Sequence, residues 1–491
     1  MQSEGYIEAE ASCLKKHQPS QNDFPSANTP LPDVEKAEVN DAGVSITGPP
    51  VIESSQTPAL NDKGIFEQQH DAPESDNSSD TDEEKNDFPE GGLRAWLVVL
   101  GSFCGSFSVF GIINSTAVLL EYFSHHQLQD NDESQIGWIF GLALFLTFFC
   151  GAPIGPIFDS YGPRALILCG SVLLVASMFL LGLCTQYWHF IMVYSVLNGI
   201  GGCLINTPCI ASIGHFFFAK RGNATGIAMT AGSIGGIIFP LMLQRLFPRV
   251  GFAWATRILG FILVFLLIMA NLLVRSRLPR KPMASFKSVS PAFSLFYKDM
   301  PFALVSLGIF LMEWGIFVPL TYITSYATSH GQSSSFGFEI IAILNAGSFF
   351  GRFFAGLVAD MIGRMNTLIL SIFMCIIACL ALWLPAGNSA PMLIVFAVIF
   401  GFVSGSNLSL SPVCVGQLCK TEHYGRYFAT CWMFVAFGTL TALPIGGQIL
   451  TMMDGDYTGL IIFAAVSYLG AALCLIAARV LKVGWKLNVI Y

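Results

Sequence analysis

The chain has 491 residues, of which 53% are hydrophobic and only 12% are charged, and its mean hydropathy is +0.61. A soluble domain carries about 25% charged residues, so this composition excludes an ordinary soluble protein and indicates a chain that has lipid as its solvent. The net charge is −7 at pH 7, but residues 1–92 hold 20 of the 32 acidic residues and only 5 of the 25 basic ones.

Residues 1–92 are predicted to form a disordered, acidic cytoplasmic tail. The segment is rich in Ser, Asn, Pro and Asp, and it cannot bury enough apolar surface to offset the entropy of ordering. It has no basic stretch followed by an apolar core, so it does not resemble a signal peptide. We therefore expect the first hydrophobic helix to act as the insertion signal.

The rest of the chain is predicted to be an all-α membrane protein with twelve transmembrane helices. A spanning helix needs about 20 predominantly apolar residues. Segments of this kind occur at 95–118, 136–157, 165–185, 188–213, 223–246, 252–274, 301–327, 338–358, 367–386, 390–413, 426–450 and 459–481. These spans predict four regions after the acidic tail: an N-terminal six-helix bundle (93–274), a basic cytoplasmic linker (275–300), a C-terminal six-helix bundle (301–482) and a cytoplasmic C-terminal tail (483–491).

Basic residues predict the orientation of these helices, because loops on the cytoplasmic side carry an excess of Lys and Arg. With the acidic tail inside, sixteen basic residues fall on the cytoplasmic side, and only Arg245 and Arg249 fall outside. We therefore expect a multi-pass protein with both termini in the cytoplasm.

One glycine–aspartate pattern occurs twice, each time where one apolar segment ends and the next begins. The two copies are Gly155-x-x-x-Asp159-x-x-Gly162-x-Arg164 and Gly356-x-x-x-Asp360-x-x-Gly363-Arg364, and their Gly, Asp and Gly positions all differ by 201. Two like-built bundles with a substrate site between them are a transporter architecture. The two segments resemble the signature of the major facilitator superfamily, which implies that fold and transport by alternating access.

At the inner membrane face, the eight residues of these two copies are predicted to act in gating, through contacts that hold the halves together on one side. The alternative is that they only cap helices and set the topology.

Two ionisable residues inside predicted helices are candidates for the transport site, because a charge within the membrane is costly and seldom faces lipid. Arg352 lies in the eighth segment, where its guanidinium could bind a substrate carboxylate through two hydrogen bonds; the alternative is snorkelling or pairing with an acid. Glu313 lies midway along the seventh segment, where a buried carboxyl group could load and release a proton; the alternative is a neutral or Arg352-paired structural acid.

Polar side chains on other helices complete the predicted substrate-binding set. Together with Arg352, this set comprises Asn114, Ser348, Asn206 and Trp432, with Asn345 and Asn407 as further candidates for lining the cavity. Each could instead hydrogen-bond a neighbouring helix. Arg257, near the outer start of the sixth helix, is expected to snorkel to the surface.

Two further stretches narrow the resemblance. Residues 90–96, EGGLRAW, precede the first helix, and residues 217–228 contain FFAKRG followed by Ala224, Gly226, Ile227 and Ala228. Over residues 90–485 they resemble the fungal branch of the monocarboxylate-transporter-like family. The resemblance implies transport of small organic anions with protons, a site Arg at position 352, and the plasma membrane as location, with the vacuolar membrane as the alternative.

Two residues of that family's pattern are missing. Its first-helix Lys aligns with Asn114, and an Asp one turn before the Arg aligns with Ser348. The resemblance therefore does not imply proton symport of lactate- or pyruvate-type substrates, and Glu313 is the candidate for a substitute proton carrier.

The function predicted is secondary active transport of a small organic anion or metabolite, with a proton as a candidate coupling ion. The alternatives are a receptor that keeps a carrier fold without turnover, and an efflux carrier for a neutral secondary metabolite. No nucleotide-binding Gly-x-x-x-x-Gly-Lys loop, His/Cys cluster or Ser/His/Asp set stands out, so we expect no enzyme activity, cofactor, metal or nucleic-acid partner. The 13 cysteines are scattered, and we expect them to be reduced and packed as small hydrophobic residues.

Overall fold

The computed structural model describes residues 88–131, 133–278 and 293–484. The predicted tail up to residue 87, most of the predicted linker and the last seven residues lie outside the described residues. Every regular element within those ranges is a helix, and this confirms the predicted all-α class.

The helices of the first half follow one another with short connections. They are α2 (Gly92–Asn114), α3 (Thr116–His125), α4 (Glu133–Phe149), α5 (Gly151–Tyr161), α6 (Arg164–Leu181), α7 (Tyr187–Phe190), the π-helical segment η1 (Ile191–Asn198), α8 (Gly199–Ile213) and α9 (Arg221–Leu273).

The second half repeats this pattern. Its elements are α10 (Ser294–Lys298), α11 (Met300–Ser329), α12 (Ser334–Ile362), α13 (Arg364–Ile377), η3 (Ala378–Trp383), α14 (Ala390–Gln417), the short η4 (Thr421–His423), α15 (Tyr424–Met452) and α16 (Thr458–Val483).

Eleven helical stretches among the described residues are long and apolar enough to cross a membrane. One of them, α9, has 53 residues and is interrupted at Gly251, whose φ of 77° and ψ of 166° are not helical. Glycine is the residue that adopts such a conformation without steric cost. Because each side of Gly251 is long enough to span a bilayer, α9 supplies the fifth and sixth helices, and the predicted twelve-helix fold is confirmed.

Some helix boundaries differ from the prediction for local reasons. The first spanning stretch extends from Gly92 to His125 and is interrupted at Ser115. There the Ser115 hydroxyl donates to the Gly111 carbonyl at 2.8 Å and the Thr116 hydroxyl donates to the Ile113 carbonyl at 2.7 Å. Bonds of this kind compete with the backbone ladder and bend helices.

The charged signature segments are more helical than the sequence suggested. Asp159 lies in the last turns of α5 and Asp360 in the last turns of α12. Each helix ends at a glycine with positive φ, 81° at Gly162 and 100° at Gly363. The predicted spans left residues 158–164 and 359–366 as connections, but only residues 162–163 and 363 lie between the observed helices. Both aspartates are therefore held on rigid helix ends.

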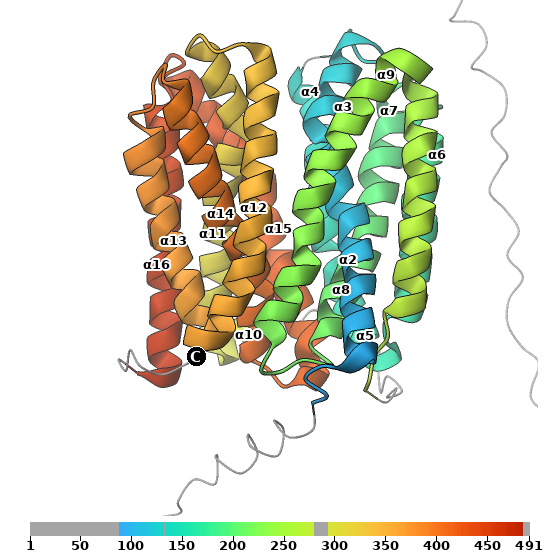
Figure 1. Cartoon of the computed structure of the whole chain (residues 1–491), viewed down its shortest axis with the longest axis vertical. Coiled ribbons are helices and arrows are strands. Elements are labelled where there is room, and N and C mark those ends of the chain that lie inside the picture. The colour runs from blue at the N-terminus through green and yellow to red at the C-terminus, as the bar shows by residue number, and fades with distance from the viewer. Residues whose placement is uncertain (1–87, 132, 279–292, 485–491) are drawn as a thin grey trace, which may run out of the picture. The chain divides into compact units, whose positions relative to one another are not determined.

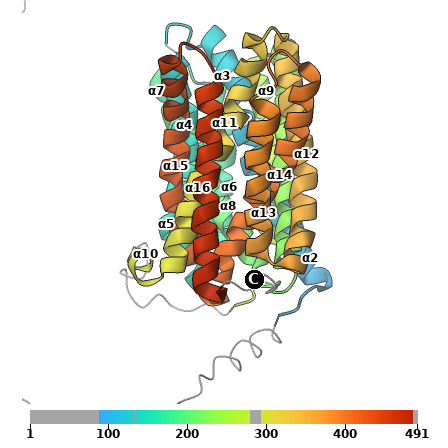
Figure 2. The same cartoon turned by 90° about the vertical axis from the view of Figure 1, so that its left-hand side faces the viewer.

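Figure 1 shows the helices α2–α9 on one side of the described structure and α11–α16 on the other, and Figure 2 shows the second group from its outer face. The two larger clusters of buried apolar residues are drawn from residues 104–274 and mainly from residues 302–478, and a small third cluster is drawn from residues 95–228 of the first half. This separation supports the two six-helix bundles, and we propose that division of the chain on this basis.

The two halves meet through a few helix pairs. Helix α9 packs along α12, and α15 packs along α4 and α5. Large apolar side chains such as Leu168, Phe265 and Leu473 are more than half exposed, as expected of positions that face lipid. The interface between the halves is where the signature segments lie.

Candidate functional site

Asp159 binds the first turn of a helix in the other half. One carboxylate oxygen accepts from the Gly425 amide at 3.0 Å, and the other accepts from the Arg426 amide at 2.8 Å. These amides belong to the start of α15, where backbone N–H groups have no partner within the helix and where the helix dipole favours an anion. We call this arrangement the Asp159 contact.

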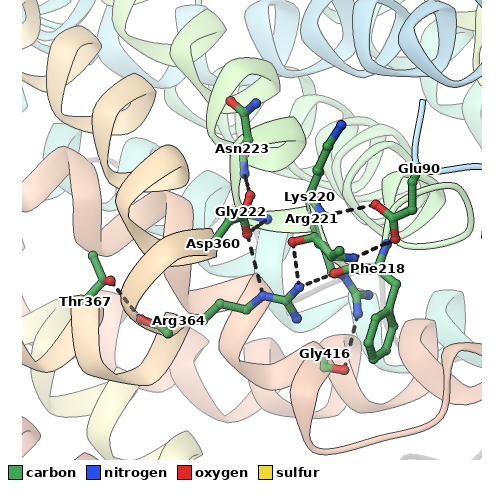
Figure 3. A network of polar contacts seen from close by, with 12 residues as sticks. Glu90, Phe218, Lys220, Arg221, Gly222, Asn223, Asp360, Arg364, Thr367 and Gly416 are labelled. Carbon is green, nitrogen blue, oxygen red and sulfur yellow. Dashed lines mark hydrogen bonds and ion pairs between the residues drawn. The ribbon is translucent and has the colours of Figure 1, made fainter. Parts of the chain in front are cut away.

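Asp360 makes the equivalent contact in the opposite direction. Its carboxylate accepts from the Gly222 amide at 3.0 Å and from the Asn223 amide at 2.8 Å, both at the start of α9. We call this arrangement the Asp360 contact (Figure 3). The aspartates differ by 201 positions and the receiving amides by 203, so the repeat seen in the sequence is also a repeat of contacts.

Two glycines bring the backbones together at these contacts. A Cβ atom on Gly155 would overlap the Gly425 carbonyl oxygen and lie 2.6 Å from the Ala429 Cβ. A Cβ on Gly356 would lie 2.5 Å from the Gly222 carbonyl oxygen. Only glycine therefore permits the helix approach that lets each aspartate reach its amides.

The arginines of the two signature copies are placed differently. Arg364 is buried, donates to the carbonyl groups of Phe218 and Ala219, and has its Nε 3.9 Å from an Asp360 oxygen. Arg164 is exposed at the start of α6. Of the eight predicted gating residues, the structure thus places Gly155, Asp159, Gly356, Asp360 and Arg364 between the halves, whereas Gly162, Gly363 and Arg164 lie at helix ends.

Sequence reasoning missed Arg221, which also bridges the halves. This side chain is 2% exposed, donates to the Gly416 carbonyl at 3.2 Å and stacks over the Tyr424 ring at 3.9 Å. A buried cation on an aromatic face gains substantial electrostatic attraction. The sequence marks Arg221 as a cytoplasmic basic residue and as part of the FFAKRG stretch, and nothing in it separates Arg221 from the neighbouring Lys220.

Sequence reasoning also missed Glu90, which we had noted only as part of a family signature. One of its oxygens accepts from the Phe218 amide at 2.7 Å and the Ala219 amide at 2.6 Å, and the other accepts from the Lys220 amide at 3.1 Å. The loop before α9 is therefore held by Glu90 on its amide side and by Arg364 on its carbonyl side (Figure 3).

His215 lies beside these contacts, outside the membrane-spanning stretches. Its ring stacks on Phe158, and its Nδ1 lies 3.0 Å from the Ser276 hydroxyl. Burial, followed by the charges of Arg221 and Arg277, lowers the pKa of His215 to about 3. The imidazole is therefore neutral at physiological pH and serves packing at this end of the molecule.

Arg352 is buried deeper between the halves, two turns before Asp360 on the same helix. It is 6% exposed, and its Nη1 donates to the Met229 carbonyl of α9 at 2.6 Å. The Asn114 amide of α2 donates to the Gly232 carbonyl of the same helix at 3.3 Å. These two predicted substrate-binding residues therefore converge on one turn of α9.

The remaining predicted substrate-binding residues are not linked to Arg352 by a hydrogen bond within the described part of the chain. Ser348 is 4% exposed and faces Gly405 of α14, where an added Cβ would lie 2.6 Å from its hydroxyl. Trp432 stacks on Phe428 at 4.5 Å. Asn206 is 1% exposed, and its carbonyl oxygen has no hydrogen-bond partner among the described residues.

Two further candidates for lining the cavity bond within the second half. Asn407 accepts from Ser371 and donates to the Cys375 sulfur at 3.3 Å, so it links α14 to α13. Asn345 donates to the Ile341 carbonyl of its own helix at 3.2 Å. Both geometries correspond to the helix-packing alternative.

Glu313 is 4% exposed in the middle of α11. Within the described residues, no hydrogen bond or ion pair is found for its carboxyl group, and it does not pair with Arg352. Its electrostatic neighbours are Cys431 of α15 and Tyr468 of α16. Glu313 is thus a buried, unpaired acid in the second half.

The two helical halves are thus joined at one end by the Asp159 and Asp360 contacts, and the buried cation Arg352 lies deeper between them. A family model described as Major Facilitator Superfamily matches residues 96–443 and 340–486. The chain belongs to the Major Facilitator Superfamily. It is therefore a multi-pass membrane transporter, and this family and fold are not those of enzymes.

Relatives of known name agree with this family. The chain is 36% identical to the riboflavin transporter MCH5 of Saccharomyces cerevisiae over 433 residues, covering 84% of this chain and 83% of that one. It is 35% identical to the fujikurins efflux protein of Gibberella fujikuroi over 394 residues, covering 80% and 84%. Among solved structures, the fucose:proton symporter of Escherichia coli superposes with a TM-score of 0.61 at 15% identity, covering 77% and 98%, a likeness that concerns the fold alone.

Proposed function

We propose that this Major Facilitator Superfamily transporter carries a small carboxylate-like organic anion by alternating access, and that Arg352 binds the anion. The observation that supports this is the incomplete pairing of Arg352. Its guanidinium is 6% exposed, its Nη1 has only the neutral Met229 carbonyl as partner, and its Nε has none among the described residues. A buried cation without a counter-ion is costly, and a bound carboxylate would relieve that cost.

The position of Arg352 links anion binding to movement of the halves. The hydrogen bond from its Nη1 to the Met229 carbonyl joins α12 to α9. A carboxylate that accepts two hydrogen bonds from the guanidinium, one of them from Nη1, competes with that carbonyl. Anion binding would therefore weaken one contact between the halves. A ligand that binds one conformation better shifts the population towards it.

We further propose that Glu313 takes up the coupling proton. A buried carboxyl group without a partner is stable as the neutral acid and can ionise when water or a cation reaches it. The burial of Glu313 and its lack of a hydrogen bond within the described residues support this role. The monocarboxylate-transporter-like branch, the predicted plasma-membrane location and the cytoplasmic termini remain predictions beside this one.

The test is flux into proteoliposomes that contain the purified full chain, measured with radiolabelled acetate, succinate, benzoate and riboflavin, with and without a pH gradient. We expect uptake of at least one carboxylate, lost about tenfold or more in Arg352→Gln, because a buried charged hydrogen bond contributes about 1.5–3 kcal/mol. Arg257→Gln is the matched control, since Arg257 also lies within a spanning stretch but stacks over Trp254 at 5.2 Å. Glu313→Gln should keep carboxylate binding and lose the pH dependence of flux.

The outcomes separate the alternatives. Flux of riboflavin alone, unchanged by Arg352→Gln, would favour a neutral-metabolite carrier, a second candidate that the relatives named as riboflavin transporter and efflux protein support. Carboxylate binding without flux would favour a receptor. Unchanged rate and pH dependence in Glu313→Gln would remove Glu313 from the proposal while leaving Arg352 in it.

A further inference from the structure

Glu90 binds three consecutive backbone amides, and its own backbone adopts a conformation that is energetically unfavourable for a residue other than glycine. Its φ of 48° is one of only two positive values found at non-glycine positions in the described ranges, and such a residue persists only where its surroundings compensate. The compensation consists of the Phe218, Ala219 and Lys220 amides, together with the Glu90 amide donating to the Phe216 carbonyl at 3.2 Å.

The amides that Glu90 binds are separated from those that Asp360 binds by a single residue, Arg221. Glu90 occupies the amides of residues 218–220, and Asp360 occupies those of residues 222 and 223. Two carboxylates, one from each half, therefore share a single run of backbone donors at the start of α9 (Figure 3). Arg364 lies within electrostatic range of both carboxylates and offsets their mutual repulsion.

The two carboxylates differ in which half carries them. Asp360 and Arg364 belong to the second half and would withdraw when the halves separate at this end. Glu90 belongs to the same half as the loop and would stay bound. Asp299 precedes α11, the first spanning helix of the second half, and it instead accepts from the Phe302 amide of its own helix at 3.3 Å.

We propose that Glu90 is a positioning residue for the Asp360 contact, acting through the loop of residues 218–220. By fixing that loop, Glu90 keeps the Gly222 and Asn223 amides oriented for Asp360 and the Phe218 carbonyl oriented for Arg364. Preorganised partners lose less entropy when they bind, so the joined state of this end forms more readily with Glu90 in place. The inference does not depend on the substrate or on Arg352.

The test is hydrogen–deuterium exchange on the full chain in lipid nanodiscs, resolved to single residues, for wild type and Glu90→Gln. We expect exchange to rise about tenfold at residues 218–220, at Gly222 and Asn223, and also at Gly425 and Arg426. The last two amides bind Asp159 in the other contact. Their exposure would show that the whole end opens more often. Glu121→Gln is the charge-matched control, since Glu121 is exposed on α3, and it should leave every one of these amides unchanged.

A purely structural role would give a different pattern. A rise confined to residues 218–220, or no rise at all, would overturn the proposal. If Glu90→Gln does not yield folded protein, Glu90→Asp serves as the second variant. It keeps the charge on a shorter side chain, and a smaller rise at Gly425 and Arg426 is expected. Adding Glu90→Gln to Arg364→Gln should raise exchange at those two amides less than it does in the wild type, because both changes act on one contact.

Discussion

Replacing Gly155 by alanine should push the two halves apart at the Asp159 contact. The added Cβ would overlap the Gly425 carbonyl oxygen and lie 2.7 Å from its carbonyl carbon. Both atoms belong to the backbone of α15, so no side-chain rotation can relieve the overlap, and helix α15 must move away from α5. In a helix that lacked this contact, the same change would be stabilising, because alanine is about 1 kcal/mol more favourable than glycine.

The magnitude follows from the cost of overpacking, which is about 1–3 kcal/mol for an added methyl group in a tightly packed site. Only the joined conformation bears this cost. The ratio of joined to separated molecules should therefore fall by a factor of about 5–150. Gly356→Ala should act in the same direction at the Asp360 contact, where the added Cβ would lie 2.9 Å from the Asn223 Cα.

The assay is single-molecule energy transfer between dyes attached through unnatural amino acids at Tyr161 and Met361, which are 50% and 72% exposed at corresponding ends of α5 and α12. We expect the long-distance population to grow in Gly155→Ala. The control is Gly141→Ala, since an added Cβ at Gly141 has nothing within 4 Å. An unchanged distance distribution in Gly155→Ala, with a control that also behaves as wild type, would refute the reasoning.

The remaining predictions concern two aspartates and one histidine. Asp360→Asn should also enlarge the separated population, and by more than Asp159→Asn does. The Asp360 carboxylate accepts from two backbone amides and also lies 3.9 Å from the Arg364 guanidinium, so its replacement removes an ion pair as well as weakening the hydrogen bonds. Equal effects of the two variants in the same energy-transfer assay would contradict this. His215 has its pKa lowered from 6.5 to about 3 by burial and neighbouring arginines, so its contribution to stability is present above pH 6.5 and is lost as the pH falls towards 3. At pH 5 the loss should be about 2 kcal/mol, and His215→Asn should flatten the pH dependence of thermal unfolding between pH 7 and pH 5; a dependence as steep as that of the wild type would show that other groups cause it.

The spanning helices could be predicted from the sequence because long apolar runs report the thickness of the bilayer directly. The repeat could be predicted because Gly155 and Gly356, and Asp159 and Asp360, keep one offset. The break at Gly251 was also accessible, since the fifth and sixth helices were separated there although the structure continues them as one element.

The partners of the signature residues could not be predicted, because they are backbone amides. A sequence distinguishes residues by their side chains, and every residue except proline has the same backbone amide. Nothing in the sequence therefore shows that the Gly222 and Gly425 amides donate to the two aspartates. Glu90 was visible only as a family pattern, and its contact with residues 218–220 joins positions about 130 residues apart. Arg221 was hidden for a different reason, since a positive charge at a helix start on the predicted cytoplasmic side is already accounted for by topology.

Both aspartates accept hydrogen bonds from backbone amides, and the two residues that donate in each contact are therefore under different evolutionary constraints. Asn223 and Arg426 donate through groups that every residue but proline possesses, so their side chains can change without loss of the bond. Gly222 and Gly425 cannot, since a Cβ there would lie 2.6 Å and 2.5 Å from the aspartate oxygen that each one binds. Among descendants of this chain, we expect freely drifting residues at positions 223 and 426 directly beside glycines that do not drift.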